Sequence, residues 1–474
     1  MNNESGSQPF IRHEVRSPAG TEALKHYANA VAVMKRREPN DPTSWVYQAA
    51  IHGTYTRPLR ELWNQCEHQS WFFLPWHRMY VYYFEQIVRK TVVEAGGPAN
   101  WALPYWNYCL GGENAALPEQ FRTPADSRNP LYVKERVASY NAGARLPDKI
   151  IDPKPALDRP NYIGIAEFGG GNGKPREPRF WGYSGLLERT PHNDVHSHIG
   201  GWMGDPETAA QDPIFWLHHA NIDRLWAVWN ERERRKNPVE ETWKLHPFWF
   251  FDGDGRKVSK QCGGVEATAP LNYTYEPSPA TIVEEPVSAS PPSPPLPPSD
   301  ATPPTSEPRF FGATEKQVPL TGAAVEVPVE IDPRGKEAVL RAAAPEEPER
   351  LYLNIEDIEG DKNPTTVYAV YLNLPQSPSS EDYERHYLGN LSFFGIEKAG
   401  DPAADKQPHG MRASFEVGPL LQSLREENGW DADHLRVLFE PIAPSSSGEA
   451  DAEPAEAEEH SPIHIGRVSL SVDA

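Results

Sequence analysis

Apolar residues recur with a helical period in the first half of the chain. His77, Val81, Phe84 and Val88 stand at i, i+4, i+7 and i+11, which is one face of an amphipathic helix. We expect this helix to begin after Pro75 and to stop at the Gly-Gly-Pro sequence that follows it. A histidine on an apolar stripe points inward, and taken alone it is usually a hydrogen-bonded core residue.

Two further segments place histidines on the face of a helix. His192 and His196 are one turn apart, so their rings share a face. Asp212 followed by proline predicts the start of another helix, because aspartate caps a helix and proline fits its first turn. The buried stripe of that helix contains His219, Ile222, Trp226 and Trp229. Three inward histidines on two helices could close around one metal ion, and His52, His68 and His77 offer a second set of three.

The pattern changes to period two in the last third of the chain. Valines at 325, 327 and 329 and Ile331 alternate with polar residues, and Pro328 suggests an edge strand. Alternation recurs at 435–439 and 468–472, with an apolar stretch at 367–375 between them. We therefore predict an antiparallel β-sandwich over residues 309–474, with a disordered acidic insert at 445–459.

Composition shifts mark the domain boundaries. Residues 277–308 are rich in proline and of low complexity, which predicts an extended linker accessible to proteases. The preceding region, 1–276, is expected to be mainly helical, as an antiparallel four-helix bundle with long loops, especially over 111–185.

Charge and length limit the function further. The chain has 474 residues and a formal net charge of −21, which argues against nucleic acid and anionic membranes as partners. No apolar run approaches the roughly 20 residues that span a bilayer, and the N-terminus shows no signal core. We expect a cytoplasmic protein; whether it forms a homo-oligomer is left open.

The histidine segments carry a family resemblance. FFLPWHR at 72–78, HNDVH at 192–196 and DPIFWLHHANIDRLW at 212–226 resemble the tyrosinase and polyphenol oxidase family of type 3 dicopper proteins. The resemblance covers roughly residues 40 to 276, up to Tyr273 and Tyr275, which match the family's closing Tyr-x-Tyr motif. It implies that the first copper is bound by His52, His68 and His77, and the second by His192, His196 and His219. His218 should point about 100° away on its helix.

The resemblance implies phenol oxidation by dioxygen. Neutral imidazole binds both Cu(I) and Cu(II), and three nitrogens per ion leave room for dioxygen between two coppers. Small phenolic compounds would be hydroxylated to o-diphenols, which would be oxidised to o-quinones. In family members that hydroxylate monophenols, a glutamate and an asparagine hold a water that deprotonates the phenol, and Glu188 and Asn193 stand at these positions. Without a functional role, Glu188 would be a solvated charge before a helix and Asn193 a first-turn polar residue.

Cys66 stands two residues before His68, as in the fungal pattern in which this cysteine is joined to the histidine by a thioether. The alternative is a plain buried thiol. The two other cysteines, Cys109 and Cys262, are most simply structural.

The C-terminal part resembles, more weakly, the shielding domain of latent polyphenol oxidases. This resemblance predicts a zymogen-like enzyme, activated when a protease cuts the linker, with an aromatic plug at Phe393 or Phe394. Both phenylalanines could instead belong to the β-sandwich core. A catechol oxidase, an o-aminophenol oxidase and a hemocyanin-like oxygen carrier remain alternatives, because all of them share the six histidines.

Overall fold

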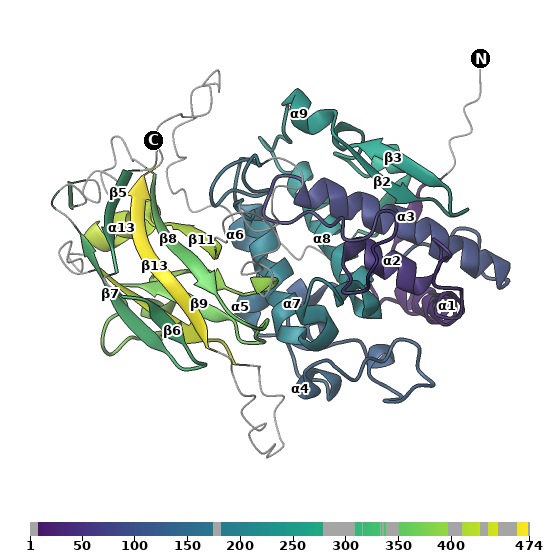
Figure 1. Ribbon diagram of the computed structural model, residues 1–474, viewed down its shortest axis with the longest axis horizontal. Coiled ribbons are helices and arrows are strands. Elements are labelled where there is room, and N and C mark those ends of the chain that lie inside the picture. Colours follow the sequence, from purple (N-terminus) through teal and green to yellow (C-terminus); the bar gives the residue numbers. More distant parts are fainter. Residues whose placement is uncertain are drawn as a thin grey trace.

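A computed structural model shows a helical lobe beside a lobe of β-strands (Figure 1). The helical lobe comes from the first 277 residues and the strand lobe from residue 309 onward. The structure describes residues 8–173, 182–277, 309–314, 316–331, 333, 336–337, 350–396, 410–426, 435–443 and 462–472. The predicted linker, apart from Pro277, and the acidic insert at 445–459 lie outside the described residues, so both stay predictions, as do the domain boundaries.

The long helices of the first lobe are α1 (Pro18–Met34), α3 (Phe73–Glu94) and α8 (Pro213–Glu231). Helix α3 begins two residues before Pro75, because a proline is tolerated in the first turn, where its missing N–H is not needed. Helix α8 begins where the sequence predicts, with the Asp212 carboxylate accepting a hydrogen bond from the N–H of Ile214 at 3.0 Å. Two shorter helices, α2 (Trp45–His52) and α7 (Asp194–Ile199), carry His52 and His196.

Aromatic packing and a buried ion network hold the helical lobe together. The Phe84 ring of α3 stacks on the Trp216 ring of α8 with their centroids 3.4 Å apart. The Asp223 carboxylate of α8 accepts hydrogen bonds from Arg12, Arg78 and the hydroxyls of both tyrosines of the Tyr-x-Tyr motif. These tyrosines lie on β4 (Tyr273–Tyr275), which pairs in parallel with β1 (Phe10–Arg12). Strands β1 and β4, at the two ends of the lobe's sequence, are thus both bound to Asp223 of α8.

The second lobe is an antiparallel sheet, as the period-two pattern predicts, but it is one curled sheet instead of two separate ones. Its strand order is β10-β9-β12-β7-β5-β13-β8-β11, with β6 paired to β13. Strand β5 pairs with both β7 and β13 and so joins the two halves. The strands are β5 (Arg309–Ala313), β6 (Val318–Leu320), β7 (Val325–Ile331), β8 (Leu351–Glu359), β9 (Tyr368–Leu372), β10 (Tyr387–Leu391), β11 (Met411–Glu416), β12 (Leu435–Pro441) and β13 (Ile463–Val472).

The prediction that Pro328 marks an edge strand is wrong. Strand β7 lies inside the sheet, between β12 and β5. Proline is tolerated there because β5 pairs only with Glu330 and Ile331, so no neighbour on that side requires an N–H from residue 328.

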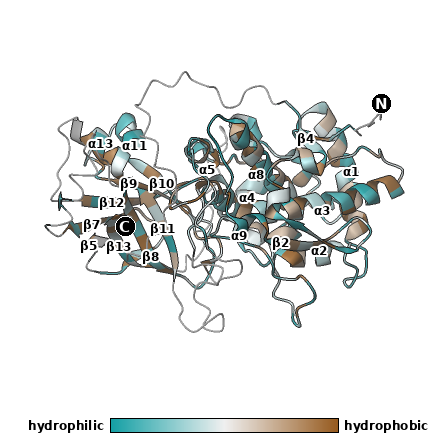
Figure 2. Cartoon of the chain, turned by 90° about the horizontal axis from the view of Figure 1, so that it is seen from above, coloured by the Kyte–Doolittle hydropathy of each residue, from teal (hydrophilic) through white to brown (hydrophobic). Residues whose placement is uncertain are grey.

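The two lobes meet along short helices of the first lobe. Helices α5 (Asp148–Ile151) and α6 (Lys154–Leu157) lie toward the strands in Figure 1, and α5 again lies between the strands and α8 when the molecule is seen from above (Figure 2). Polar contacts cross this boundary: Arg350 forms an ion pair with Glu167 at 2.7 Å, and Arg159 forms one with Glu416. In the described parts of the chain, no helix is long and apolar enough to cross a membrane.

Candidate metal centre

The first group of histidines comes from two helices and the loop between them. His52 is the last residue of α2, His77 lies in the first turns of α3, and His68 lies in the connecting loop. One ligand nitrogen from each ring lies within 4.8 Å of the others. The structure therefore brings together three residues that span 25 positions of the sequence, from His52 to His77.

Backbone carbonyls orient two of these rings. The Nδ1 of His52 donates to the carbonyl oxygen of Pro206 at 2.8 Å, and the Nδ1 of His77 donates to that of Phe73 at 2.8 Å. These bonds assign the tautomer in which Nε2 carries a lone pair. Within the part of the chain that the structure describes, the Nε2 of His77 is buried and accepts no hydrogen bond, as expected of a nitrogen aimed at a metal.

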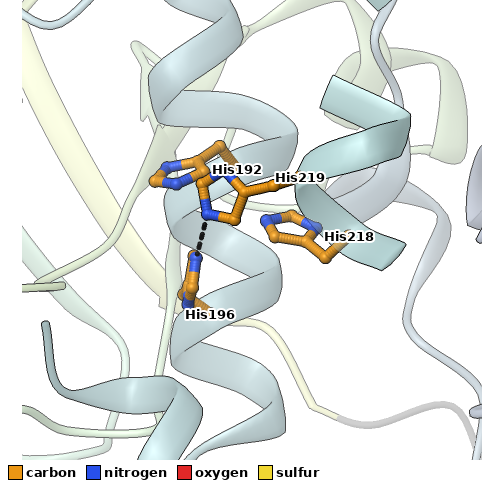
Figure 3. A group of neighbouring side chains, drawn as sticks. All are labelled: His192, His196, His218 and His219. Carbon is orange, nitrogen blue, oxygen red and sulfur yellow. Dashed lines mark hydrogen bonds between the residues drawn. The ribbon is translucent and has the colours of Figure 1, made fainter. Parts of the chain in front are cut away.

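The second group contains His192, His196, His218 and His219, whose ligand atoms also lie within 4.8 Å of one another (Figure 3). His192 lies in a helical turn, η4 (Glu188–Asn193), that leads directly into α7, which carries His196. The Nδ1 of His196 donates to the carbonyl oxygen of Met203 at 2.7 Å, and its Nε2 lies 3.3 Å from the Nε2 of His219. Figure 3 draws this contact as a dashed line between α7 and α8.

The expectation that His218 points away from the centre is wrong. Its ring centroid lies 4.8 Å from that of His196 and 5.4 Å from that of His192. Adjacent side chains on a helix diverge by 100°. The rings of His218 and His219 nevertheless both lie near the histidine rings of η4 and α7. A hydrogen bond of 3.0 Å between the hydroxyl of Tyr108 and the Nδ1 of His218 holds the ring in this position.

The two groups face each other. The rings of His77 and His219 stack with centroids 4.6 Å apart and an interplanar angle of 12°. His68 lies 5.7 Å from His192, again between ring centroids. Phe215 packs on His219 at 4.1 Å and on His52 at 5.0 Å, and such apolar rings exclude water from the space between the groups.

Burial favours the neutral form of several of these imidazoles. It lowers the pKa of His77, His196 and His219 well below the usual value, and neighbouring imidazoles lower it further. Burial also lowers the pKa of His192 to about 3. Neutral imidazole is the form that binds a metal, and neither of the two groups includes a carboxylate. The donor set therefore fits copper better than a hard cation such as Mg²⁺.

Glu188 lies beside the centre and is 1 % exposed. Its Oε1 accepts a hydrogen bond from the backbone N–H of Gln69 at 2.7 Å. Burial raises the pKa of Glu188 to about 8, against the effect of that bond. The solvated charge considered as an alternative from the sequence is therefore not what the structure contains.

Asn193 has a role that its sequence position does not reveal. Its Oδ1 accepts a hydrogen bond from the Nδ1 of His192 at 2.8 Å, so it orients that ring. Asn193 also lines a cavity of about 30 Å³ together with Gln69 and Asn390, and this volume is large enough for a water molecule.

The two candidate plug residues, Phe393 and Phe394, pack in different lobes. The Phe393 ring is fully buried in the core of the β-sheet, 6.1 Å from the ring of Tyr368. Phe394 instead packs with the helical lobe, and its ring stacks on His196 with centroids 4.3 Å apart and an angle of 22°. The rings of His68 and His192 lie 5.8 and 5.9 Å from it.

Cysteines and neighbouring histidines complete the surroundings of the centre. Cys66 and Cys262 are buried, Cys109 is partly buried, and the structure contains no disulfide among the three. His198 is 3 % exposed, and its Nδ1 forms a hydrogen bond with the hydroxyl of Tyr140 at 2.8 Å.

Several residues that shape the centre carry no signal in the sequence. The carbonyls of Pro206 and Met203 act through the backbone, which any residue could supply. Asn390 of β10 donates to the Asp194 carboxylate at 2.7 Å, and this contact joins residues 196 positions apart. In the sequence, the signal that points to Asn390 is its position four residues before Phe394.

Comparison with known proteins agrees with this geometry. Residues 42–232 match the family model described as the common central domain of tyrosinase, and residues 307–472 match a domain of unknown function (DUF7868). The chain is 35 % identical to tyrosinase HcTyr1 of Hahella sp. (strain CCB-MM4) over 95 % of this chain and 96 % of the relative. It is 29 % identical to the latent polyphenol oxidase of Prunus armeniaca, over 54 % of this chain but only 47 % of that relative.

Solved structures share the two-lobed fold. Latent apple tyrosinase superposes with a TM-score of 0.61 at 21 % identity, covering 100 % of this chain and 99 % of the other. A latent aurone synthase gives 0.65 at 20 % identity, with 100 % and 91 % covered. Fold, histidine groups and relatives together define a copper oxidoreductase of the type 3 class. The chain belongs to the tyrosinase and polyphenol oxidase family, whose members act on phenolic substrates, and it carries that family's C-terminal domain.

Proposed function

We propose that this chain oxidises monophenols to o-diphenols and o-diphenols to o-quinones, using dioxygen. In this proposal one copper is held by His52, His68 and His77, and a second is held by His192, His196 and His219. The observation that carries it is the pair of facing imidazole groups, which contain no carboxylate and in which burial lowers the pKa of His77 and His196. Bound copper would supply the redox chemistry and the site for dioxygen.

The protein contributes orientation and exclusion of water. Helices α2, α3, α7 and α8 carry His52, His77, His196 and His219, while His192 comes from η4 and His68 from a loop. Carbonyl oxygens on Nδ1 keep the lone pairs of His52, His77 and His196 directed inward. We assign the second copper to His219 instead of His218 because the family motif uses the second histidine of the pair, although both rings belong to the second group.

Glu188 is the base that we propose for monophenols. A carboxyl group whose pKa is about 8 is a far stronger base than an ordinary glutamate, so it takes a proton from a phenol more readily. Gln69, whose backbone N–H binds the Glu188 carboxylate, and Asn193 line a cavity with room for a water molecule, which we propose as the relay for this proton. The reaction then begins from a phenolate.

The C-terminal lobe makes the enzyme latent in this proposal. The Phe394 ring occupies the position over His196 that a phenol ring would need. Removal of the lobe, after a protease cuts within 277–308, would expose the centre to substrate.

Oxygen uptake tests the proposal. Copper-loaded protein is assayed with L-tyrosine and with catechol, before and after limited proteolysis of the linker. We expect little uptake from the intact chain and a sharp rise with both substrates after cleavage. No uptake with either substrate from cleaved, copper-loaded protein would refute phenol oxidation.

One observation favours a narrower enzyme as second candidate. The Oδ1 of Asn193 is occupied by His192, so that oxygen is less available to hold a water. A catechol or o-aminophenol oxidase would oxidise catechol or 2-aminophenol after cleavage but leave L-tyrosine unchanged. Sustained turnover of any of these substrates would exclude an oxygen carrier.

A further inference from the structure

Lys149 of the helical lobe inserts its ammonium group among three tyrosine rings of the C-terminal lobe. Its Nζ lies 4.8 Å from the ring centroid of Tyr371, 4.9 Å from that of Tyr387 and 6.0 Å from that of Tyr383. The Nζ also donates a hydrogen bond to the hydroxyl of Tyr371. The hydroxyl oxygen of Tyr371 and the rings of Tyr383 and Tyr387 thus surround one cation, and aromatic rings attract ammonium groups by cation–π interaction.

The three rings form a built cage, because they also contact one another. Tyr371 meets Tyr383 edge to face at 5.4 Å, and it meets Tyr387 at 5.8 Å. Tyr371 is 1 % exposed and lies on β9, while Tyr387 begins β10 and Tyr383 lies on α11 (Ser380–Arg385). The walls therefore come from three elements of one lobe, whereas the occupant comes from the other lobe.

The electrostatic surroundings favour a cation. Burial lowers the pKa of Lys149, but the carboxylates of Glu440 and Glu384 favour its charged form. Glu440 also accepts a hydrogen bond from the hydroxyl of Tyr383 at 3.4 Å. A cationic ligand would meet the same rings and the same acids.

A cavity between the lobes leads to the cage. A cavity of about 640 Å³ between the lobes is lined by Lys149 and Asp152 on one side and by Tyr383, Glu384 and Tyr387 on the other. This volume is in the range of small-molecule sites. A ligand of a few heavy atoms can therefore approach the rings without separating the lobes first.

The cage is coupled to the metal centre through β10. Asn390 lies on the same strand as Tyr387 and accepts a hydrogen bond from its hydroxyl at 2.5 Å. The amide of Asn390 donates to the carbonyl oxygen of Lys149 at 2.8 Å and to Asp194 at 2.7 Å. The chain then reaches Phe394, which covers His196. The position of the Phe394 ring thus depends on β10, which is hydrogen-bonded to the cage through Asn390.

We propose that Tyr371, Tyr383 and Tyr387 form an ammonium-binding site, which Lys149 occupies in the closed protein and for which alkylammonium and quaternary ammonium ligands compete. Binding of the ammonium ligand is independent of the proposed function. Its consequence, release of the Phe394 segment, rests on the latent enzyme proposed above. Quaternary ammonium ligands enter through the cavity between the lobes. Occupation of the cage by such a ligand loosens β10 from the helical lobe.

The binding test uses the full chain and tetramethylammonium chloride as the probe, with sodium chloride at the same ionic strength as the reference. Hydrogen exchange measured by mass spectrometry follows the segments at 368–372 and 387–391. In Lys149→Ala, which vacates the cage, we expect saturable protection of these segments by tetramethylammonium. The affinity should be about tenfold higher than in the unmodified chain, where Lys149 competes for the same rings.

Matched variants decide whether the rings bind the cation. Adding Tyr383→Leu to Lys149→Ala should abolish the protection, whereas Tyr383→Phe, which keeps the ring, should retain it. Lys260→Ala is the control, because Lys260 faces a single ring, that of Tyr82 at 5.9 Å; its exchange should match that of the unmodified chain. Absence of saturable protection in Lys149→Ala, or protection that survives loss of the Tyr383 ring, would overturn the proposal.

Two further measurements keep the test decisive. If Lys149→Ala does not fold, the single variants Tyr383→Leu and Tyr383→Phe are compared for exchange at residues 148–151, where only the leucine variant should exchange faster. Catechol oxidation is measured in parallel on the cleaved protein. Loss of catechol oxidation with intact tetramethylammonium binding would refute the proposed function alone. Catechol oxidation without tetramethylammonium binding would refute the ammonium site alone.

Discussion

Replacement of Phe394 by alanine should release the latent activity without any cut in the linker. The ring belongs to a residue that is 4 % exposed, and it stacks on His196 with centroids 4.3 Å apart. Burial of a phenylalanine side chain is worth about 1.5 to 3 kcal/mol, and an aromatic pair adds about 0.5 to 1.5 kcal/mol. The closed position is therefore stabilised by roughly 2 to 4 kcal/mol through this ring.

This free energy converts into an expected gain in rate. Each 1.4 kcal/mol is a factor of about ten, so Phe394→Ala should raise kcat/KM for catechol at least about tenfold in the intact chain. The assay is initial oxygen uptake by copper-loaded protein, well below the unfolding temperature. After linker cleavage and removal of the C-terminal lobe, the variant and the unmodified protein should have equal activity, because the ring is then absent from both.

Phe393→Ala is the matched control. Phe393 is fully buried in the sheet, so its truncation should cost about 3 to 5 kcal/mol of unfolding free energy in the C-terminal lobe. While that lobe stays folded, as followed by its thermal unfolding, catechol oxidation should remain latent. Less than a twofold gain in Phe394→Ala, or an equal gain in folded Phe393→Ala, would refute the plug.

Three further predictions concern the helical lobe. Asp223→Asn leaves Arg78 and a second buried arginine without a carboxylate and should lower the unfolding free energy by about 3 to 5 kcal/mol, measured by thermal unfolding; a loss below about 1 kcal/mol would contradict this. Peptide mapping of copper-loaded protein should find Cys66 and His68 cross-linked and lighter by two hydrogens, and Cys66→Ser should abolish the cross-link. Monophenol oxidation should rise as the pH increases through about 8, because ionised Glu188 is the base; Glu188→Gln should remove that rise but keep catechol oxidation, and an unchanged pH profile would exclude this role.

Local patterns in the sequence predicted the elements that bring the centre together. The stripe through His77 and the Asp212 cap located α3 and α8, and alternation located β7, β12 and β13, because these signals depend on neighbouring residues alone. The inward position of His218 was missed, because it depends on which face α8 presents to α7. A sequence cannot show which of two adjacent phenylalanines crosses to the other lobe, since that depends on how the chain leaves β10.

Contacts between the lobes were the least predictable part of the structure. Lys149 and Tyr371 are 222 residues apart, and neither lies in a motif. Lysine at a loop-rich position is ordinarily a solvated charge, and tyrosines on strands are ordinarily packing residues. Only the three-dimensional arrangement places the ammonium group of Lys149 beside Tyr371.

The copper content of the full chain tests the central claim most directly. Metal analysis after copper loading is carried out on the unmodified protein, on His77→Ala in the first group and on His196→Ala in the second. Two separate sites of three imidazoles predict two coppers per chain in the unmodified protein and one in each variant. A single copper in the unmodified protein, or a copper content that neither substitution changes, would contradict the two-site centre.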